Sequence, residues 1–158
     1  MSLSFSDMWD LTQENHNYAT FSCELLIGIF WEETMFTNRR QLHGPAVGFG
    51  QVEPATIKAV NAYYGMNFSE TLVLISDAAS VQITSYVLRM LNEKGLTPSA
   101  ALNAYAGASV RAANKKKVIQ WQACERILLS GDVDDINTVR RALIAAEPNH
   151  RAAVDSVL

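Results

Sequence analysis

One stretch of the sequence combines the residue types that general acid catalysis needs. Glu33 follows an apolar run from Leu25 to Trp31, and Met35 and Phe36 come directly after it. A carboxyl at the end of a helix faces the negative pole of the helix dipole, and apolar neighbours solvate it poorly. Both effects favour the protonated form, so we expect a raised pKa for Glu33. A carboxyl protonated near neutral pH can donate its proton to a glycosidic oxygen.

A glycine-rich segment follows and ends eighteen residues after Glu33, at Gln51 in the run Gly48-Phe49-Gly50-Gln51. Glycines allow a close approach of backbone to a ligand, and the Gln51 amide offers a donor and an acceptor to sugar hydroxyls or an N-acetyl group. Glu53 precedes the expected helix start at Pro54, where a negative charge is favourable. A role for Glu53 as a second catalytic carboxylate is the alternative interpretation.

The hydrophobic pattern predicts that helices position these groups. We expect helices over about 5–13, 18–33, 54–64, 69–94, 98–105 and 114–129, a further helix carrying Ile136, Val139 and Leu143, and a terminal helix after Pro148. Residues 37–47 are expected to form a loop, and a short hairpin within 37–51 is left open. The run Lys115–Lys117 is interpreted as a solvated helix face, with contact to an anionic polymer as the alternative.

The order of these motifs resembles that of the soluble lytic transglycosylases, within the lysozyme-like superfamily. The family pattern reads E-S-x-[FW], then G-[LI]-M-Q-x-x-P-x-T, with the same eighteen-residue step from the acid to the Gln. A third segment, Ala101–Gly107, looks like the family's A-L-x-A-Y-N-A-G. The resemblance is strongest over residues 25–110. It selects Glu33 over Glu32, which points about 100° away on the helix and is interpreted as a surface or buttressing carboxyl.

The resemblance implies a mainly α, lysozyme-like single domain over residues 1–158 that cleaves the β-1,4 bond between N-acetylmuramic acid and N-acetylglucosamine in peptidoglycan. Glu33 is the implied catalytic acid and base, and the product carries a 1,6-anhydro sugar. The resemblance also assigns substrate contacts, to Gly48, Phe49, Gly50, Gln51 and Tyr105. No cofactor and no metal is implied, and the expected partner is the glycan strand.

Two alternatives remain open. The first is a hydrolase of the same fold, a muramidase or a chitinase-like enzyme, in which Glu53 orients a water molecule. The second is a non-catalytic glycan-binding or assembly domain. It is suggested by Leu42 and Pro45, which stand where the family usually has Ser and Gly, and by the Tyr105 segment, which is one residue shorter than the family's.

The composition is that of one ordinary globular domain. The chain has 158 residues, 49% of them hydrophobic, and a net charge of −3, which indicates neither disorder nor a nucleic-acid footprint. Cys23 and Cys124 lie in apolar helical stretches and are expected to be buried free thiols. The three histidines are too scattered for a local metal motif.

The N-terminus lacks the features of a signal peptide, and the longest apolar run, seven residues, is too short to span a membrane. We therefore expect a soluble monomer. A wall-directed enzyme of this kind would reach the wall through phage lysis, through a secretion machine, or from a precursor whose leader has been removed.

Overall fold

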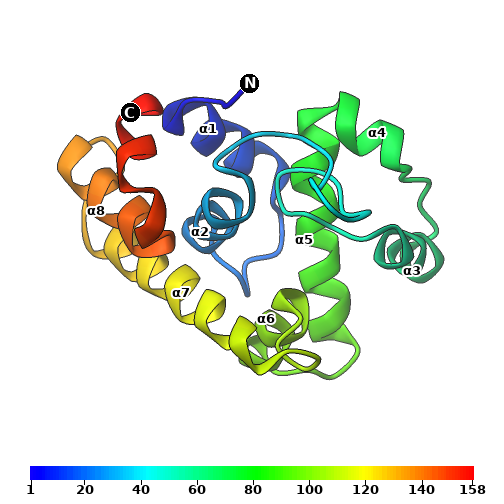
Figure 1. The fold of residues 1–158 in the computed structure, drawn as a ribbon. Helices are drawn as coiled ribbons and strands as arrows, with labels where there is room; N and C mark the ends of the chain where they lie inside the picture. Colours follow the sequence, from blue (N-terminus) through cyan, green and yellow to red (C-terminus); the bar gives the residue numbers. More distant parts are fainter.

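The computed structural model describes residues 1–158, which form helices joined by loops (Figure 1). The α-helices are α1 (Phe5–Asn15), α2 (Cys23–Thr34), α3 (Pro54–Tyr64), α4 (Glu70–Ile75), α5 (Asp77–Glu93), α6 (Pro98–Ala106), α7 (Lys115–Ser130) and α8 (Ile136–Ala146). Two 3-10 helices complete the set, η1 (Ala112–Asn114) and η2 (Pro148–Ser156). The mainly helical class predicted from the sequence is confirmed.

Helix α2 lies in the middle of the molecule, and Figure 1 views it nearly along its axis. All seven residues from Leu25 to Trp31 are buried, as expected for a helix that is apolar on every side. Its first turn is capped by Ser22, whose hydroxyl accepts a hydrogen bond from the Leu25 N–H at 3.0 Å. Helices α1, α7 and α8 pack around α2, so the end of α2 is held from several sides.

Buried apolar side chains form two clusters. The larger surrounds α2 and takes in Phe36, Trp121 and Leu143, while the smaller joins α3, α5 and the loop before α3 through Val47, Val60 and Val87. Helix α5 contributes side chains to both clusters, Leu88 to the larger and Val87 to the smaller. Leu91 of α5 and Tyr105 of α6 pack against both clusters.

The single long helix predicted over 69–94 is wrong, because the chain breaks at Ser76. Ser76 has an extended backbone (φ −121°, ψ 109°) and separates α4 from α5. Its hydroxyl accepts a hydrogen bond from the Ala79 N–H at 3.1 Å. A Ser side chain that caps a new helix competes with the backbone hydrogen bonds that would continue the preceding helix. The apolar residues keep their helical spacing across Ser76, so the sequence pattern did not indicate the break.

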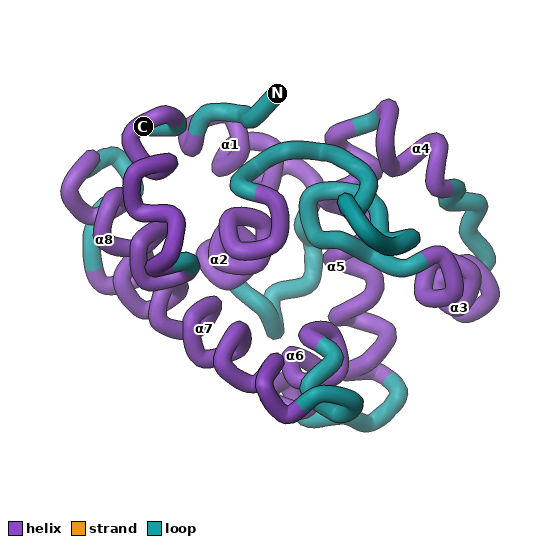
Figure 2. Tube along the Cα trace, viewed as in Figure 1, coloured by secondary structure: helices purple, strands orange, loops and turns teal.

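The segment between α2 and α3 is a loop that crosses in front of α5 (Figure 2). The hairpin left open by the sequence is reduced to two isolated antiparallel bridges, Arg40 with Val47 and Val47 with Val52. The terminal segment after Pro148 also differs from expectation, since it forms a 3-10 helix with a kink at His150.

Both cysteines are free, as predicted, although only Cys124 is fully buried and Cys23 is half-buried. None of the helices combines the length and the apolar character that crossing a lipid bilayer requires.

Candidate active site

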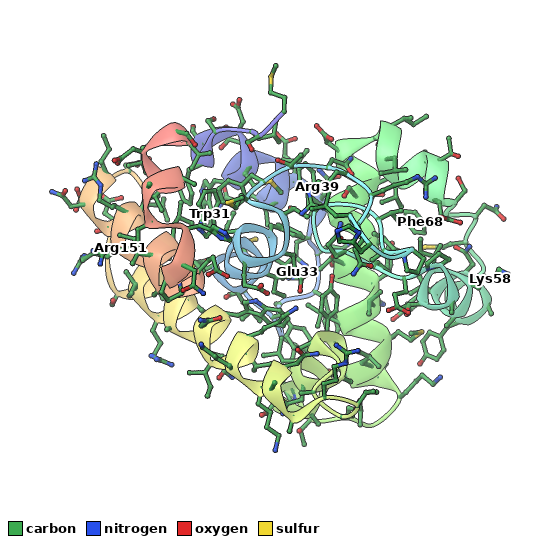
Figure 3. The ribbon with its side chains drawn as sticks, viewed as in Figure 1. Trp31, Glu33, Arg39, Lys58, Phe68 and Arg151 are labelled. Atoms are coloured by element: carbon green, nitrogen blue, oxygen red, sulfur yellow. The ribbon has the colours of Figure 1, made fainter.

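The carboxyl end of α2 presents Glu33. After Thr34 the chain turns sharply, because Met35 (φ 51°) and Phe36 (φ 62°) both adopt the left-handed conformation, which is uncommon outside glycine. Phe36 is fully buried against Trp31, with ring centroids 5.0 Å apart. This packing compensates for the strained backbone and fixes the place where α2 ends. In Figure 3 Glu33 lies in the middle of the molecule, whereas Lys58 and Arg151 lie at opposite edges.

The surroundings of Glu33 favour its protonated form. Its side chain is 15% exposed, and its carboxyl oxygen Oε1 lies 3.4 Å from Nζ of Lys117. Burial raises the pKa of Glu33 to about 7, the negative charge of Glu32 acts in the same direction, and the Lys117 ammonium opposes both. Near neutral pH both the protonated and the ionised forms of the carboxyl are therefore populated. A group that acts as both general acid and general base needs both forms.

Glu32 is placed behind the site. The indole Nε1 of Trp121 donates a hydrogen bond to its Oε1 at 3.1 Å, and burial raises its pKa. Glu32 does not line the pocket in which Glu33 lies. The sequence interpretation did not anticipate its electrostatic effect on Glu33, because angular separation on a helix says little about charge interaction in a poorly solvated interior.

A pocket of about 640 Å³ opens beside Glu33. It brings together four residues singled out from the sequence, Glu33, Gln51, Glu53 and Tyr105. They come from α2, the glycine-rich loop, the start of α3 and α6. The pocket walls also include Lys117 of α7 and Val87 and Leu91 of α5, so segments far apart in the chain meet around one carboxyl.

Glycines let the loop and α6 approach each other. The Tyr105 hydroxyl donates a hydrogen bond to the Gly50 carbonyl at 2.7 Å and lies 2.9 Å from the Thr84 hydroxyl. A Cβ on Gly50 would clash with both hydroxyl groups. Gly48 has φ 89°, and a Cβ there would lie 2.7 Å from the Ser80 hydroxyl oxygen. Packing therefore requires glycine at both positions, and at Gly48 the left-handed backbone requires it as well.

Gln51 reaches the pocket with half of its hydrogen-bonding capacity already used. Its backbone is left-handed (φ 52°), and its Nε2 donates to the carbonyls of Arg39 at 3.1 Å and Gly48 at 3.0 Å. The amide oxygen has no partner within the protein. Gln51 is thus oriented as a hydrogen-bond acceptor, whereas its residue type alone had suggested both roles.

Phe49 does not contribute its side chain to the pocket, in contrast to the substrate contact implied by the resemblance. It is 1% exposed and packs on Phe30, with ring centroids 6.0 Å apart. Its carbonyl accepts a hydrogen bond from the Thr34 hydroxyl at 2.9 Å, which joins the loop to the end of α2. Phe49 anchors the loop, and Gly48 and Gly50, which also lie outside the pocket lining, shape it.

Lys117 is the functional residue that the sequence interpretation missed. It was grouped with Lys115 and Lys116, which are indeed exposed, but Lys117 is half-buried and faces Glu33. One signal was available in the sequence. Trp121 lies one turn later on the same face of α7 and is fully buried, so Lys117 belongs to the inward side of the helix.

A scan against protein-family models and searches among curated proteins and solved structures found no match to this chain.

Gly50→Ala is expected to lower the free energy of unfolding by about 1–3 kcal/mol, because the added methyl group must displace Tyr105 or Thr84. Urea denaturation measures this loss. The same displacement moves the loop that carries Gln51. Gly44→Ala is the matched control: like Gly50 it does not have a left-handed backbone, and the nearest atoms to its new Cβ belong to the flexible side chain of Gln41. A Gly50→Ala protein as stable as wild type would contradict the packing argument.

Proposed function

We propose that this protein is a glycosidase that cleaves the β-1,4 bond between N-acetylmuramic acid and N-acetylglucosamine in peptidoglycan, as a lytic transglycosylase of lysozyme-like fold. The observation that supports it most is the state of Glu33: a single carboxyl, largely buried, with a pKa raised to about 7, in a pocket of about 640 Å³. The motif order that places Gln51 and Tyr105 beside this acid supports the same assignment.

In the first step, protonated Glu33 donates its proton to the glycosidic oxygen, and the bond from that oxygen to C1 of the muramic acid breaks. The raised pKa keeps the proton available near neutral pH. Gln51 is suited to hold the sugar, because its amide oxygen accepts a hydrogen bond from a hydroxyl or an N-acetyl N–H while its nitrogen is tied to the loop.

In the second step, ionised Glu33 takes the proton from the C6 hydroxyl of the muramic acid, and the oxygen attacks C1. The new C6–O–C1 bond closes the 1,6-anhydro ring and returns the proton to Glu33. The nucleophile belongs to the substrate, so no second carboxylate is needed to orient water. Lys117, 3.4 Å from Oε1, stabilises the carboxylate between the two steps.

A hydrolytic muramidase is the second candidate, because Glu53 lines the same pocket. Glu53 stands before the first residue of α3, is exposed, and makes no side-chain capping bond. Its carboxylate is thus free to orient a water molecule toward C1, which is the second role that an inverting hydrolase requires.

The products separate these candidates. Purified peptidoglycan is incubated with the wild-type protein, and the soluble fragments are analysed by mass spectrometry. Anhydro-muropeptides are expected, 18 Da lighter than the hydrolysis products with a free reducing end, because the internal C6 hydroxyl replaces water. Hydrated reducing ends, lost in Glu53→Gln, would establish the hydrolase instead. Strands that bind without being cleaved would favour a non-catalytic glycan-binding domain and would refute the proposed activity.

A further inference from the structure

The charges around the pocket are unevenly distributed. Four acidic or basic side chains line it, Glu33, Glu53, Arg111 and Lys117. Glu33 and Lys117 form an ion pair with each other. Glu53 stands immediately before α3, and Arg111 lies in the segment between α6 and α7. Arg111 is therefore the one cation of the pocket wall that no internal carboxylate neutralises.

The guanidinium of Arg111 is free to bind a ligand. Arg111 is exposed, and its side chain takes part in no hydrogen bond or ion pair with the rest of the chain. Its neighbours in the pocket wall are small or apolar, among them Ala106, Gly107 and Val110. The sequence from 104 to 117 contains no acidic residue, although the chain as a whole carries a net charge of −3. The positive charge on this side of the pocket is thus uncompensated.

The glycan strand carries its negative charge at defined places. N-acetylglucosamine is neutral, whereas muramic acid bears a lactyl group on O3 that ends either in a carboxylate or in a stem peptide with carboxylates. A guanidinium binds a carboxylate through two parallel N–H···O bonds, and this geometry adds specificity to the charge attraction. A single Arg in the same pocket as Glu33 can therefore distinguish the two alternating sugars.

We propose that Arg111 binds a carboxylate of the muramic acid substituent and so sets the register of the strand, with muramic acid rather than N-acetylglucosamine held where Glu33 acts. The inference rests on the proposed function for its substrate. It gives Arg111 a role in substrate specificity, while the proton transfers remain with Glu33.

The test compares three kinds of glycan strand: strands bearing an L-Ala–D-Glu stem, the same strands with both stem carboxylates amidated, and strands without a stem, in which the lactyl carboxylate is free. The first two differ only in charge. Affinity is measured by isothermal titration calorimetry in the Glu33→Gln background, where the strands stay intact. Arg111→Gln is added to this background, and Arg126→Gln is the matched control, an exposed arginine on α7 outside the pocket.

Strands with free carboxylates are expected to bind about three- to tenfold more tightly than amidated strands, as for a charge-assisted hydrogen bond at an exposed site. Arg111→Gln should abolish this preference and Arg126→Gln should keep it, and added salt should weaken it. In stem-bearing strands the lactyl carboxyl forms the amide bond to L-Ala and is uncharged. If stripped strands bind like the free-carboxylate strands, Arg111 accepts either carboxylate, and if they bind like the amidated ones, it recognises the stem. If only the stripped strands bind more tightly than the amidated ones, it recognises the lactyl carboxylate.

Equal affinity for all three kinds of strand, or a preference that survives in Arg111→Gln, would overturn the inference. Cleavage by the wild-type protein is followed separately on the same strands. A carboxylate preference without any cleavage would refute the glycosidase while leaving carboxylate recognition by Arg111 in place. Cleavage that ignores the carboxylates would refute the role of Arg111 alone.

Discussion

Glu33→Gln is expected to slow glycan cleavage by about two to four orders of magnitude, the usual contribution of a positioned general acid and base. Glutamine keeps the size and the hydrogen-bonding oxygen of the side chain, but it can neither donate a proton to the glycosidic oxygen nor take one from the C6 hydroxyl. Release of soluble anhydro-muropeptides from purified peptidoglycan gives the rates. Activity within tenfold of wild type would exclude Glu33 as the catalytic acid.

Glu32→Gln is the matched control, because it changes the adjacent residue in the same way. The amide oxygen can still accept the hydrogen bond from Trp121 Nε1. Removing the charge of Glu32 takes away one of the causes that raise the pKa of Glu33. We expect this variant to remain active but to lose activity at a lower pH than wild type, since Glu33 then ionises earlier as the pH rises. A pH profile identical to wild type would show that Glu32 does not act on Glu33.

Glu33→Gln is also expected to make the protein more stable at alkaline pH. The pKa of Glu33 is about 7 in the folded protein, against 4.5 for the unperturbed group. Between these values the folded state holds a proton that the unfolded state has released, so wild-type stability falls as the pH rises through this window. Glutamine stays neutral at every pH. Each pKa unit corresponds to about 1.4 kcal/mol, so the variant gains up to about 3 kcal/mol at pH 8 and little near pH 4.5.

Urea denaturation gives the free energy of unfolding of the wild type and of Glu33→Gln at pH 5 and at pH 8. The effect is the amount by which the difference between the two proteins changes from pH 5 to pH 8. Glu53→Gln serves as the control, because Glu53 is exposed and surface substitutions usually alter stability by less than about 0.5 kcal/mol. A difference between Glu33→Gln and wild type that is the same at both pH values would contradict the raised pKa. The expected gain in stability with a loss of activity is typical of a residue held in a strained functional site.

Local sequence was sufficient to predict a helix or a helix end wherever a short motif determines it. The apolar run before Glu33 predicted the buried helix α2, and Pro54 and Gly65 marked the ends of α3 as the structure has them. Thr97 and Pro98 likewise marked the start of α6. These signals act within a few residues through backbone dihedrals and capping bonds, so they hold whatever the rest of the chain does.

Local sequence patterns did not predict the break at Ser76 or the inward position of Lys117. Ser76 sits in an apolar pattern that continues across it, and the balance between helix and cap is decided by what α4 and α5 pack against. Lys117 stands in a run of three lysines, and only the packing of Trp121 against α2 turns that one lysine toward Glu33. Contacts between residues far apart in the chain decide both cases.

For the site, the sequence by itself determined which residue types are available and their spacing: a carboxyl at the end of an apolar helix, a glycine-rich loop ending in Gln51, and Tyr105 at the end of a short helix. The tertiary structure decided the electrostatics. The pKa of Glu33 depends on burial, on Glu32 and on Lys117, which is 84 residues away along the chain. A pKa reflects every charge and every loss of solvent around the group, and only the folded chain defines those surroundings.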